Sequence, residues 1–178
     1  TKDYIYNYYM TPIQECIKNK NHKTKAIWLM RQAGRYLPEF RKIRAKNPDF
    51  IKLCLEENLS AEITLQPIRR FNFDAAIIFS DILMLPYGLG QEVKFEKNFG
   101  PKLGELNLDK ISNTSEADFK KKLNPIYELI SKVSKDPILK NKDVIGFIGA
   151  PWTILVYMVN KISPKKNLSE NFYNDKLL

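Results

Sequence analysis

Histidine and cysteine are scarce in this sequence, with one histidine and two cysteines among 178 residues. His22 lies in the polar run KNKNHKTK, which is typical of a solvated loop. Cys16 and Cys54 lie far apart and form no CxxC pair, so we expect two reduced thiols rather than a disulfide or a zinc site. The composition therefore gives no support for a histidine-based catalytic triad or a metal centre.

Long apolar runs are also missing. None reaches the roughly 18 residues that a transmembrane helix requires. The longest, from Val144 to Val159, is interrupted by Gly146, Gly149 and Pro151. The opening residues TKDYIYNYYM lack the basic start and apolar stretch of a signal peptide. We therefore expect a cytoplasmic protein that makes no membrane contact.

What the sequence has in excess is positive charge. Lysine and arginine outnumber aspartate and glutamate by 29 to 20, so the formal net charge is +9. This sign favours an acidic partner: nucleic acid, an anionic membrane or a polyanionic small molecule. The lysines are scattered and form no aromatic-interleaved stripe of the kind that indicates nucleic-acid binding. The arginines are grouped, and arginine makes bidentate contacts with carboxylates and phosphates: Arg31, Arg35, Arg41, Arg44, Arg69 and Arg70.

Three short apolar runs predict buried parallel strands at 26–30 (AIWLM), 75–79 (AAIIF) and 143–150 (DVIGFIGA). Between 84 and 105 the chain is rich in glycine and proline, which indicates a long loop. That loop carries a short strand pair, with residues 92–95 as one arm.

Helices are expected between these runs. The predicted segments are Pro12–Lys18, Asp49–Cys54, a helix that begins at Asn58 or Ser60 and is kinked or shortened by Pro67, residues 115–134, and a helix that Pro151 opens. The fourth is the clearest amphipathic pattern. Its apolar residues recur at spacings of three and four: Phe119, Leu123, Ile126, Tyr127, Ile130 and Val133.

The order strand, loop, helix, repeated three times, predicts a parallel α/β protein. In barrels of this kind the active residues come from the carboxyl ends of the strands. Arg31 and Gln32 follow the first predicted strand, Asp81 follows the second, and residues 149–152 follow the third. We therefore expect these three groups on one rim of the fold.

Asp81 lies between two apolar runs, where a carboxylate is costly to bury without partners. One interpretation is structural: Asp81 caps the next helix or pairs with an arginine. The other is functional: Asp81 accepts N–H bonds from a ligand that develops positive charge.

Arg31 and Arg35 flank the tripeptide QAG, a spacing that lets both guanidinium groups face one anionic ligand. The alternative is an ion pair with Glu39 or contact with a helix end. For Tyr157 and Trp152 the position on a helix favours a core role. Arg69 and Arg70 fit the C-terminus of a helix, where they complement its dipole; these two are the last arginines in the sequence.

Long stretches of the chain closely resemble the uroporphyrinogen decarboxylase family. They are IWLMRQAGRYLPEFR (27–41), TLQPIRRFNFDAAIIFSDIL (64–83) and VIGFIGAPWTILVYMV (144–159), and the loop at 88–103 fits as well. The resemblance runs from about Tyr4 to the end. It implies a (β/α)₈ TIM barrel, usually a homodimer, that converts the four acetate arms of uroporphyrinogen to methyl groups and gives coproporphyrinogen.

The resemblance also implies roles for single residues. The RQAGR segment, Arg31, Gln32, Ala33, Gly34 and Arg35, would hold substrate carboxylates. Asp81 would bind the pyrrole N–H groups at the centre of the macrocycle and act as the catalytic residue. Tyr157 would lie near a substrate carboxylate. No metal or organic cofactor is implied. A pyrrole protonated on a ring carbon accepts the electron pair itself, and a preorganised carboxylate stabilises the resulting charge.

The chain departs from the family in length. Three strands are visible where a closed barrel needs eight, so we expect residues 1–178 to be the N-terminal part of a single domain, truncated at its C-terminus and inactive alone. An inactive remnant, a corrinoid or thiol methyltransferase on a related barrel, and a basic nucleic-acid-binding fragment are the alternatives. Methyltransferases of that kind use zinc ligands from the second half of the barrel. The RQAGR and FSDIL segments favour the decarboxylase, with no nucleic acid and no membrane as partner.

Overall fold

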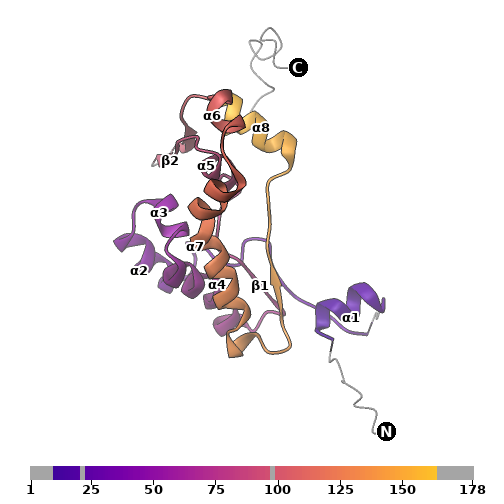
Figure 1. Ribbon diagram of the computed structural model, residues 1–178. Coiled ribbons are helices and arrows are strands. Elements are labelled where there is room, and N and C mark those ends of the chain that lie inside the picture. Colours follow the sequence, from indigo (N-terminus) through magenta and orange to yellow (C-terminus); the bar gives the residue numbers. More distant parts are fainter. Residues whose placement is uncertain (1–9, 21–22, 97–98, 164–178) are drawn as a thin grey trace.

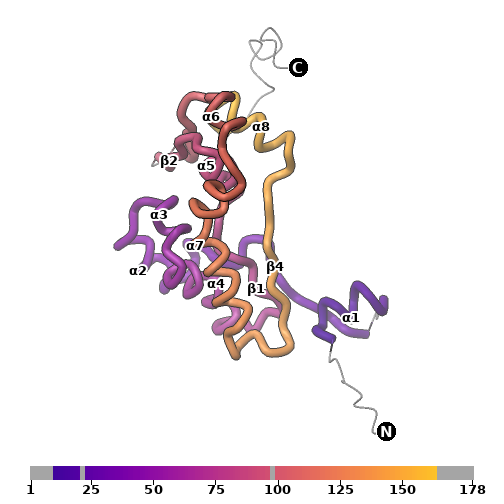
Figure 2. Tube along the Cα trace, viewed as in Figure 1, coloured from indigo at the N-terminus to yellow at the C-terminus, as the bar shows by residue number. Residues whose placement is uncertain are grey.

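The computed structural model describes residues 10–20, 23–96 and 99–163, and it has a mixed α/β fold (Figure 1). His22 lies outside the described residues. Helices gather on one side of a short parallel sheet, and the extended segment that contains one of its two strands continues beyond the sheet to the last helix (Figures 1 and 2). The α/β class predicted from the sequence is therefore confirmed.

The parallel sheet consists of β1 (Ala75–Ile77) and β4 (Asp143–Ile145). Ala75 lies opposite Asp143 and Ile77 opposite Ile145. One further hydrogen bond, from Ile78 N–H to Ile145 O at 3.0 Å, continues the pairing beyond β1. The predicted strands at 75–79 and 143–150 are thus confirmed as parallel neighbours, although both are shorter than their apolar runs.

The predicted strand at 26–30 is wrong for this structure. The segment approaches β1 only at its beginning, where Asp74 N–H donates to Ile27 O at 2.9 Å and the Asp74 carboxylate accepts the N–H of Ile27 at 2.7 Å. Its apolar side chains were expected to be buried on both faces, but residues 27–30 are all exposed. A strand forms from paired backbone groups and covered faces, and this segment has neither along most of its length.

Helix α4 (Glu57–Phe71) packs against β1 and is largely buried. Its N-cap is Glu56, whose side chain accepts the N–H of Leu59, so the predicted caps Asn58 and Ser60 are wrong. Pro67 does not shorten the helix, which continues to Phe71 and ends at Asn72 in the left-handed conformation. Pro67 is itself buried, and the packing around it outweighs the hydrogen bond that a proline removes.

Helix α7 (Glu116–Ser134) begins where the sequence predicts, with the Ser115 hydroxyl accepting the N–H of Asp118 at 3.1 Å. Its buried face differs from the prediction, because Leu129 is fully buried while Tyr127 and Ile130 are exposed. The difference arises because α7 packs on α4 through Leu129 and Val133, a contact that periodicity alone does not locate.

The remaining elements include several confirmed predictions. Helices α1 (Pro12–Lys18), α3 (Phe50–Cys54) and α8 (Pro151–Asn160) form as expected, and strands β2 (Val93–Glu96) and β3 (Gly100–Leu103) make the antiparallel pair. Three helices and a 3₁₀ turn were not predicted: α2 (Pro38–Lys46), α5 (Met84–Gly88), α6 (Leu108–Ser112) and η1 (Pro137–Leu139).

The core forms in three main parts around these elements. One lies between α4, α7 and the sheet, and includes Ile68, Ala76 and Leu129. A second joins α5, β2, β3 and α8. The third packs α2 and α3 against α4 through Phe40 and Leu53. Helix α1 stays outside them; it has no buried residue and reaches the sheet through Asp143, which accepts hydrogen bonds from Thr11 and Gln14.

Candidate functional site

Asp81 follows the carboxyl end of β1 and precedes α5. One carboxylate oxygen, Oδ1, accepts the N–H of Leu83 at 2.8 Å, and the Asp81 carbonyl accepts the N–H of Met84 at 3.1 Å. The carboxylate therefore fixes the turn before α5, but it is not the cap that the structural interpretation expects, because the N-cap of α5 is Leu83 and no side chain caps this helix. Within the described residues, its other oxygen has no hydrogen-bond partner and no arginine pairs with it.

Burial raises the pKa of the Asp81 carboxyl above its ordinary value, and the hydrogen bond from Leu83 N–H offsets part of that rise. The neighbouring Cys54 thiol is fully buried, and burial together with the charge of Asp81 raises its pKa strongly. Cys54 is therefore an unreactive thiol. The environment of Asp81 is poor in water, which is where a fixed carboxylate acts most strongly on a developing positive charge.

The loop after β4 reaches the segment that carries Asp81. A Cβ atom on Gly149 would lie 3.2 Å from Ile82 Cβ and 2.4 Å from Ile154 Cδ1. A side chain at this position would require Ile154 and Ile82 to shift, so Gly149 packs closely against the segment after β1 and the loops that follow the two parallel strands are in contact. The second and third of the three predicted groups are therefore brought together.

The loop at 31–35 is held near the start of β1, at the end of the strand away from Asp81. Gln32 is buried; its Nε2 donates to Ala75 O at 2.9 Å and its Oε1 accepts the N–H of Leu29 at 3.2 Å. Ala75 is the first residue of β1, whereas Asp81 follows its end. Among the described residues no hydrogen bond or ion pair joins Arg31 or Arg35 to Asp81. The structure thus does not place the first group in contact with the other two.

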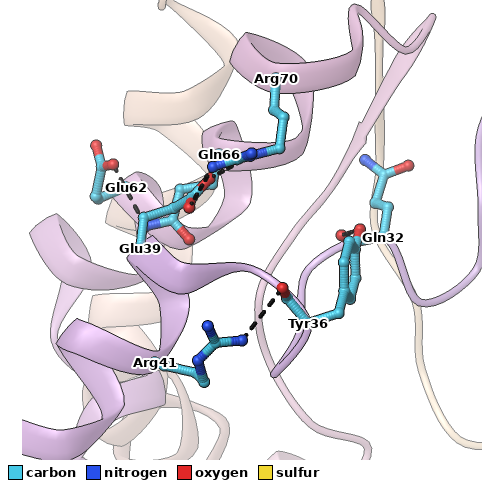
Figure 3. A network of polar contacts seen from close by, with 7 residues as sticks. All are labelled: Gln32, Tyr36, Glu39, Arg41, Glu62, Gln66 and Arg70. Atoms are coloured by element: carbon cyan, nitrogen blue, oxygen red, sulfur yellow. Dashed lines mark hydrogen bonds and ion pairs between the residues drawn. The ribbon is translucent and has the colours of Figure 1, made fainter.

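Neither guanidinium of this loop is paired within the described part of the chain. Arg31 and Arg35 are both exposed. The alternative partner, Glu39, is occupied by Arg70, which donates from Nε and Nη2 to its two carboxylate oxygens at 2.8 Å each (Figure 3). This ion pair lowers the pKa of the Glu39 carboxyl. Arg70 therefore pairs with Glu39 as well as lying in the last turn of α4, and Arg31 and Arg35 keep their donors available for an anion.

Two side chains fix the backbone of this loop (Figure 3). The Tyr36 hydroxyl donates to the carbonyl of Gln32, and Arg41 Nη1 donates to the carbonyls of Arg35 and Tyr36 at 2.9 and 3.3 Å. The Tyr36 ring also stacks on Phe71 at the end of α4, with ring centroids 6.3 Å apart. These contacts hold the loop in one shape and leave its arginines unpaired.

The remaining predicted residues occupy different surroundings. Ala33 packs against the core part around Leu37 and Phe40. A Cβ on Gly34 would make only ordinary contact with the Tyr36 ring, at 3.7 Å. Tyr157 is half-buried on α8, packs against the second core part, and places its hydroxyl 3.3 Å from Ser163 Oγ. Its predicted core role is thus confirmed.

The core role predicted for Trp152 is wrong, because this side chain is exposed. Sequence reasoning also missed Gln91, a buried residue whose Nε2 donates to Gly104 O and Met158 O at 2.9 Å each. Gln91 ties the end of α8 to the β3 strand. It lies in a glycine-rich loop with no periodic pattern, so its burial leaves no signal in the sequence.

A groove of about 660 Å³ lies elsewhere on the molecule, between α3 and β2. Phe50, Tyr87 and Lys122 are among its lining residues, and none of the predicted site residues lines it. Within the described ranges, no group of three or more histidine, cysteine, aspartate or glutamate residues could hold a metal ion. No helix in that part of the chain has the length and apolar character needed to cross a membrane.

A two-stranded parallel sheet with α4 packed against it, and Asp81 after the carboxyl end of β1, define an α/β protein with its candidate site at the strand ends. The chain belongs to the uroporphyrinogen decarboxylase family, because the model of that family, "Uroporphyrinogen decarboxylase (URO-D)", matches residues 9–175.

Named relatives agree with the family. The chain is 43% identical over 156 residues to a uroporphyrinogen decarboxylase of Caulobacter vibrioides, an alignment that covers 88% of this chain and 44% of the relative. It is 43% identical over 161 residues to one of Rickettsia felis, covering 89% and 46%, and 48% identical over 133 residues to one of Rickettsia canadensis, covering 75% and 39%. The chain thus spans less than half the length of these relatives.

Proposed function

We propose that this chain forms the first part of a (β/α)₈ barrel that decarboxylates uroporphyrinogen III to coproporphyrinogen III in porphyrin and haem biosynthesis. The observation that carries the proposal is the carboxylate of Asp81. It lies after the carboxyl end of a parallel strand, half-buried, with one oxygen fixed by Leu83 N–H and the other without a partner among the described residues. This is the end of the strands at which barrel enzymes build their sites.

Asp81 suits a reaction that creates positive charge on a pyrrole. A proton added to the ring carbon beside the one that bears the acetate arm makes the ring cationic. The C–CO₂ bond then breaks, its electron pair moves into the ring, CO₂ leaves, and a second proton converts the exocyclic carbon to a methyl group while the first is released. Asp81 accepts the ring N–H and stabilises the cation without reorganising, so the ring replaces an organic cofactor as electron sink.

The loop at 31–35 supplies the substrate's counter-charges in this proposal. Uroporphyrinogen carries eight carboxylates, and Arg31 and Arg35 have free bidentate donors to hold them. Gln32 positions the loop through its bonds to Ala75 and Leu29. Ala33 and Gly34 keep the backbone between the two arginines open to a carboxylate. Tyr157, on α8, contacts a further carboxylate through its hydroxyl.

The complete enzyme would be a cytoplasmic homodimer, with this chain providing one part of each barrel. The described part of the chain forms a parallel sheet of two strands, whereas a closed barrel needs eight, so we expect the isolated chain to produce no coproporphyrinogen by itself.

A chimera tests the proposal directly. The 161 residues that align with the Rickettsia felis relative replace their counterpart in it, and turnover of uroporphyrinogen is followed by chromatography of the oxidised products. We expect turnover by the chimera, with KM raised at least tenfold by Arg31→Ala or Arg35→Ala. Arg69→Ala is the matched control, because Arg69 pairs with Glu62 on the surface of α4 and should leave KM unchanged. A folded chimera without turnover would contradict the proposal.

A further inference from the structure

The groove between α3 and β2 has aromatic walls and lies apart from the candidate site. Its volume of about 660 Å³ is in the range of small-molecule sites, and residues of α5 and α7 complete its lining. Phe50, Tyr87 and Phe95 are half-buried there, and the Phe50 and Phe95 rings lie with their centroids 4.6 Å apart. These side chains offer partly exposed rings against which a flat aromatic molecule can pack.

The charges along the groove leave one cation uncompensated. Each carboxylate that lines the groove forms an ion pair with a lysine: Asp49 with Lys52, Glu92 with Lys94, and Glu96 with Lys102. Lys122 also lines the groove, and among the described residues no carboxylate pairs with it. Its ammonium lies instead over the Tyr87 ring, 4.5 Å from the ring centroid. The groove therefore has a positive charge available to an anion.

A second ammonium lies at the same end of the groove. Gly90 is a lining residue whose N–H donates to Tyr87 O at 3.0 Å, and a Cβ on Gly90 would lie 2.8 Å from Lys110 Cε and 3.5 Å from Lys110 Nζ. Lys110 likewise has no ion pair within the described ranges. Burial and the charge of Lys110 lower the pKa of the Lys122 ammonium below its ordinary value. An anion beside both lysines would offset this repulsion.

The groove also contains a hydrogen-bond acceptor that lacks a donor. Gln91 lines the groove and is only 4% exposed. Its Nε2 donates to Gly104 O and Met158 O, but no donor reaches its Oε1 in the part of the chain that the structure describes. A buried acceptor without a partner is costly. An N–H group on an occupant of the groove would satisfy it.

We propose that this groove is a binding site for a planar aromatic anion that carries an N–H donor. The ring system packs against the aromatic walls, the anionic group faces Lys110 and Lys122, and the N–H donates to Gln91 Oε1. None of the residues assigned to uroporphyrinogen lines the groove, so the inference does not depend on the proposed function.

Isothermal titration of the 178-residue chain with indoleacetate tests the proposal, because this probe has a flat ring, a carboxylate and a ring N–H. We expect it to bind. Indoleacetamide has no charge and should bind about tenfold more weakly, since a charge-assisted hydrogen bond is lost. N-methylindoleacetate has no N–H and should bind about fivefold more weakly. The ligand is changed here because the Gln91 amide also holds two carbonyls of the fold.

Two lysine variants locate the bound probe. Lys122→Met keeps an apolar stem beside Tyr87 without the charge and should weaken indoleacetate binding about tenfold. Lys121→Met is the matched control: it removes the same charge from the neighbouring position on α7, outside the groove, and should bind like the unaltered chain. Circular dichroism checks that both variants are folded. The proposal is overturned if indoleacetate does not bind, if it binds no more tightly than either analogue, or if the two variants bind it equally.

Discussion

Arg70 grips Glu39 through two parallel hydrogen bonds, both 2.8 Å long, and so joins the last turn of α4 to the first turn of α2. The loop at 31–35 enters α2 directly. Glu39 is the nearby carboxylate with which Arg31 or Arg35 could form an ion pair. Because Glu39 pairs with Arg70 instead, the start of α2 is fixed against α4 and both guanidinium groups of the loop stay available. Arg70 thus supports the fold, while substrate binding by Arg31 and Arg35 is part of the proposed function.

Replacing Glu39 by glutamine should make stability depend less on pH. The ion pair lowers the pKa of Glu39 below its ordinary value of 4.5, so its stabilising effect is present above that pH and is lost as pH falls through the lower folded value. We expect Glu39→Gln to lower Tm slightly at pH 7, and the difference from the unaltered chain to vanish at low pH. The pair is exposed, so high salt should also shrink the difference. A Tm difference that grows on acidification would contradict this assignment.

Leu129 and Ile130 are adjacent on α7, but their truncation to alanine should change the free energy of unfolding by very different amounts. Leu129 is fully buried between α7 and α4, whereas Ile130 is exposed. Leu129→Ala should lower the free energy of unfolding by about 2–5 kcal/mol, since it leaves a cavity. Ile130→Ala should change it by less than about 1 kcal/mol, as a surface substitution does. Urea unfolding measures both, and equal losses would show that the buried face of α7 is misassigned.

Two glycines of the segment after β4 form a second matched pair. A Cβ on Gly149 would lie 2.4 Å from Ile154 Cδ1, whereas one on Gly146 meets nothing within 4 Å. Gly149→Ala should therefore cost about 1–3 kcal/mol of unfolding free energy through overpacking. Gly146→Ala should be neutral or stabilising by up to about 1 kcal/mol. Urea unfolding again decides, and a neutral Gly149→Ala would contradict the close packing of this glycine against Ile154 and Ile82.

Local signals predicted much of this fold. Pro12, Ser115 and Pro151 mark the starts of helices that form where expected, and the apolar runs at 75–79 and 143–150 give the two paired strands. The run at 26–30 is as apolar as the run at 75–79 and forms no strand. Composition reports that a segment can be buried, but a strand also needs neighbours on its edge and faces.

The candidate site shows the same difference between residues that follow paired strands and residues that follow the unformed strand. Asp81 and the Gly149 loop follow paired strands and lie together, so their convergence follows from the parallel order alone. Arg31 and Arg35 follow a predicted strand that does not form, so the order of strands in the sequence does not by itself place them beside Asp81. Gln91 and the Glu39–Arg70 pair act through contacts between residues distant in sequence, which no local pattern records.

The role of Asp81 is the central claim, and Asp81→Asn in the Rickettsia felis chimera tests it most directly. Asparagine keeps an oxygen for Leu83 N–H but carries no charge. Burial raises the pKa of Asp81, so its ionisation destabilises the fold as pH rises through that pKa; at pH 7 the variant should unfold at a Tm no lower than the parent's. The account predicts that uroporphyrinogen turnover falls by about 10²–10³-fold in this folded variant. Near-normal turnover would contradict it.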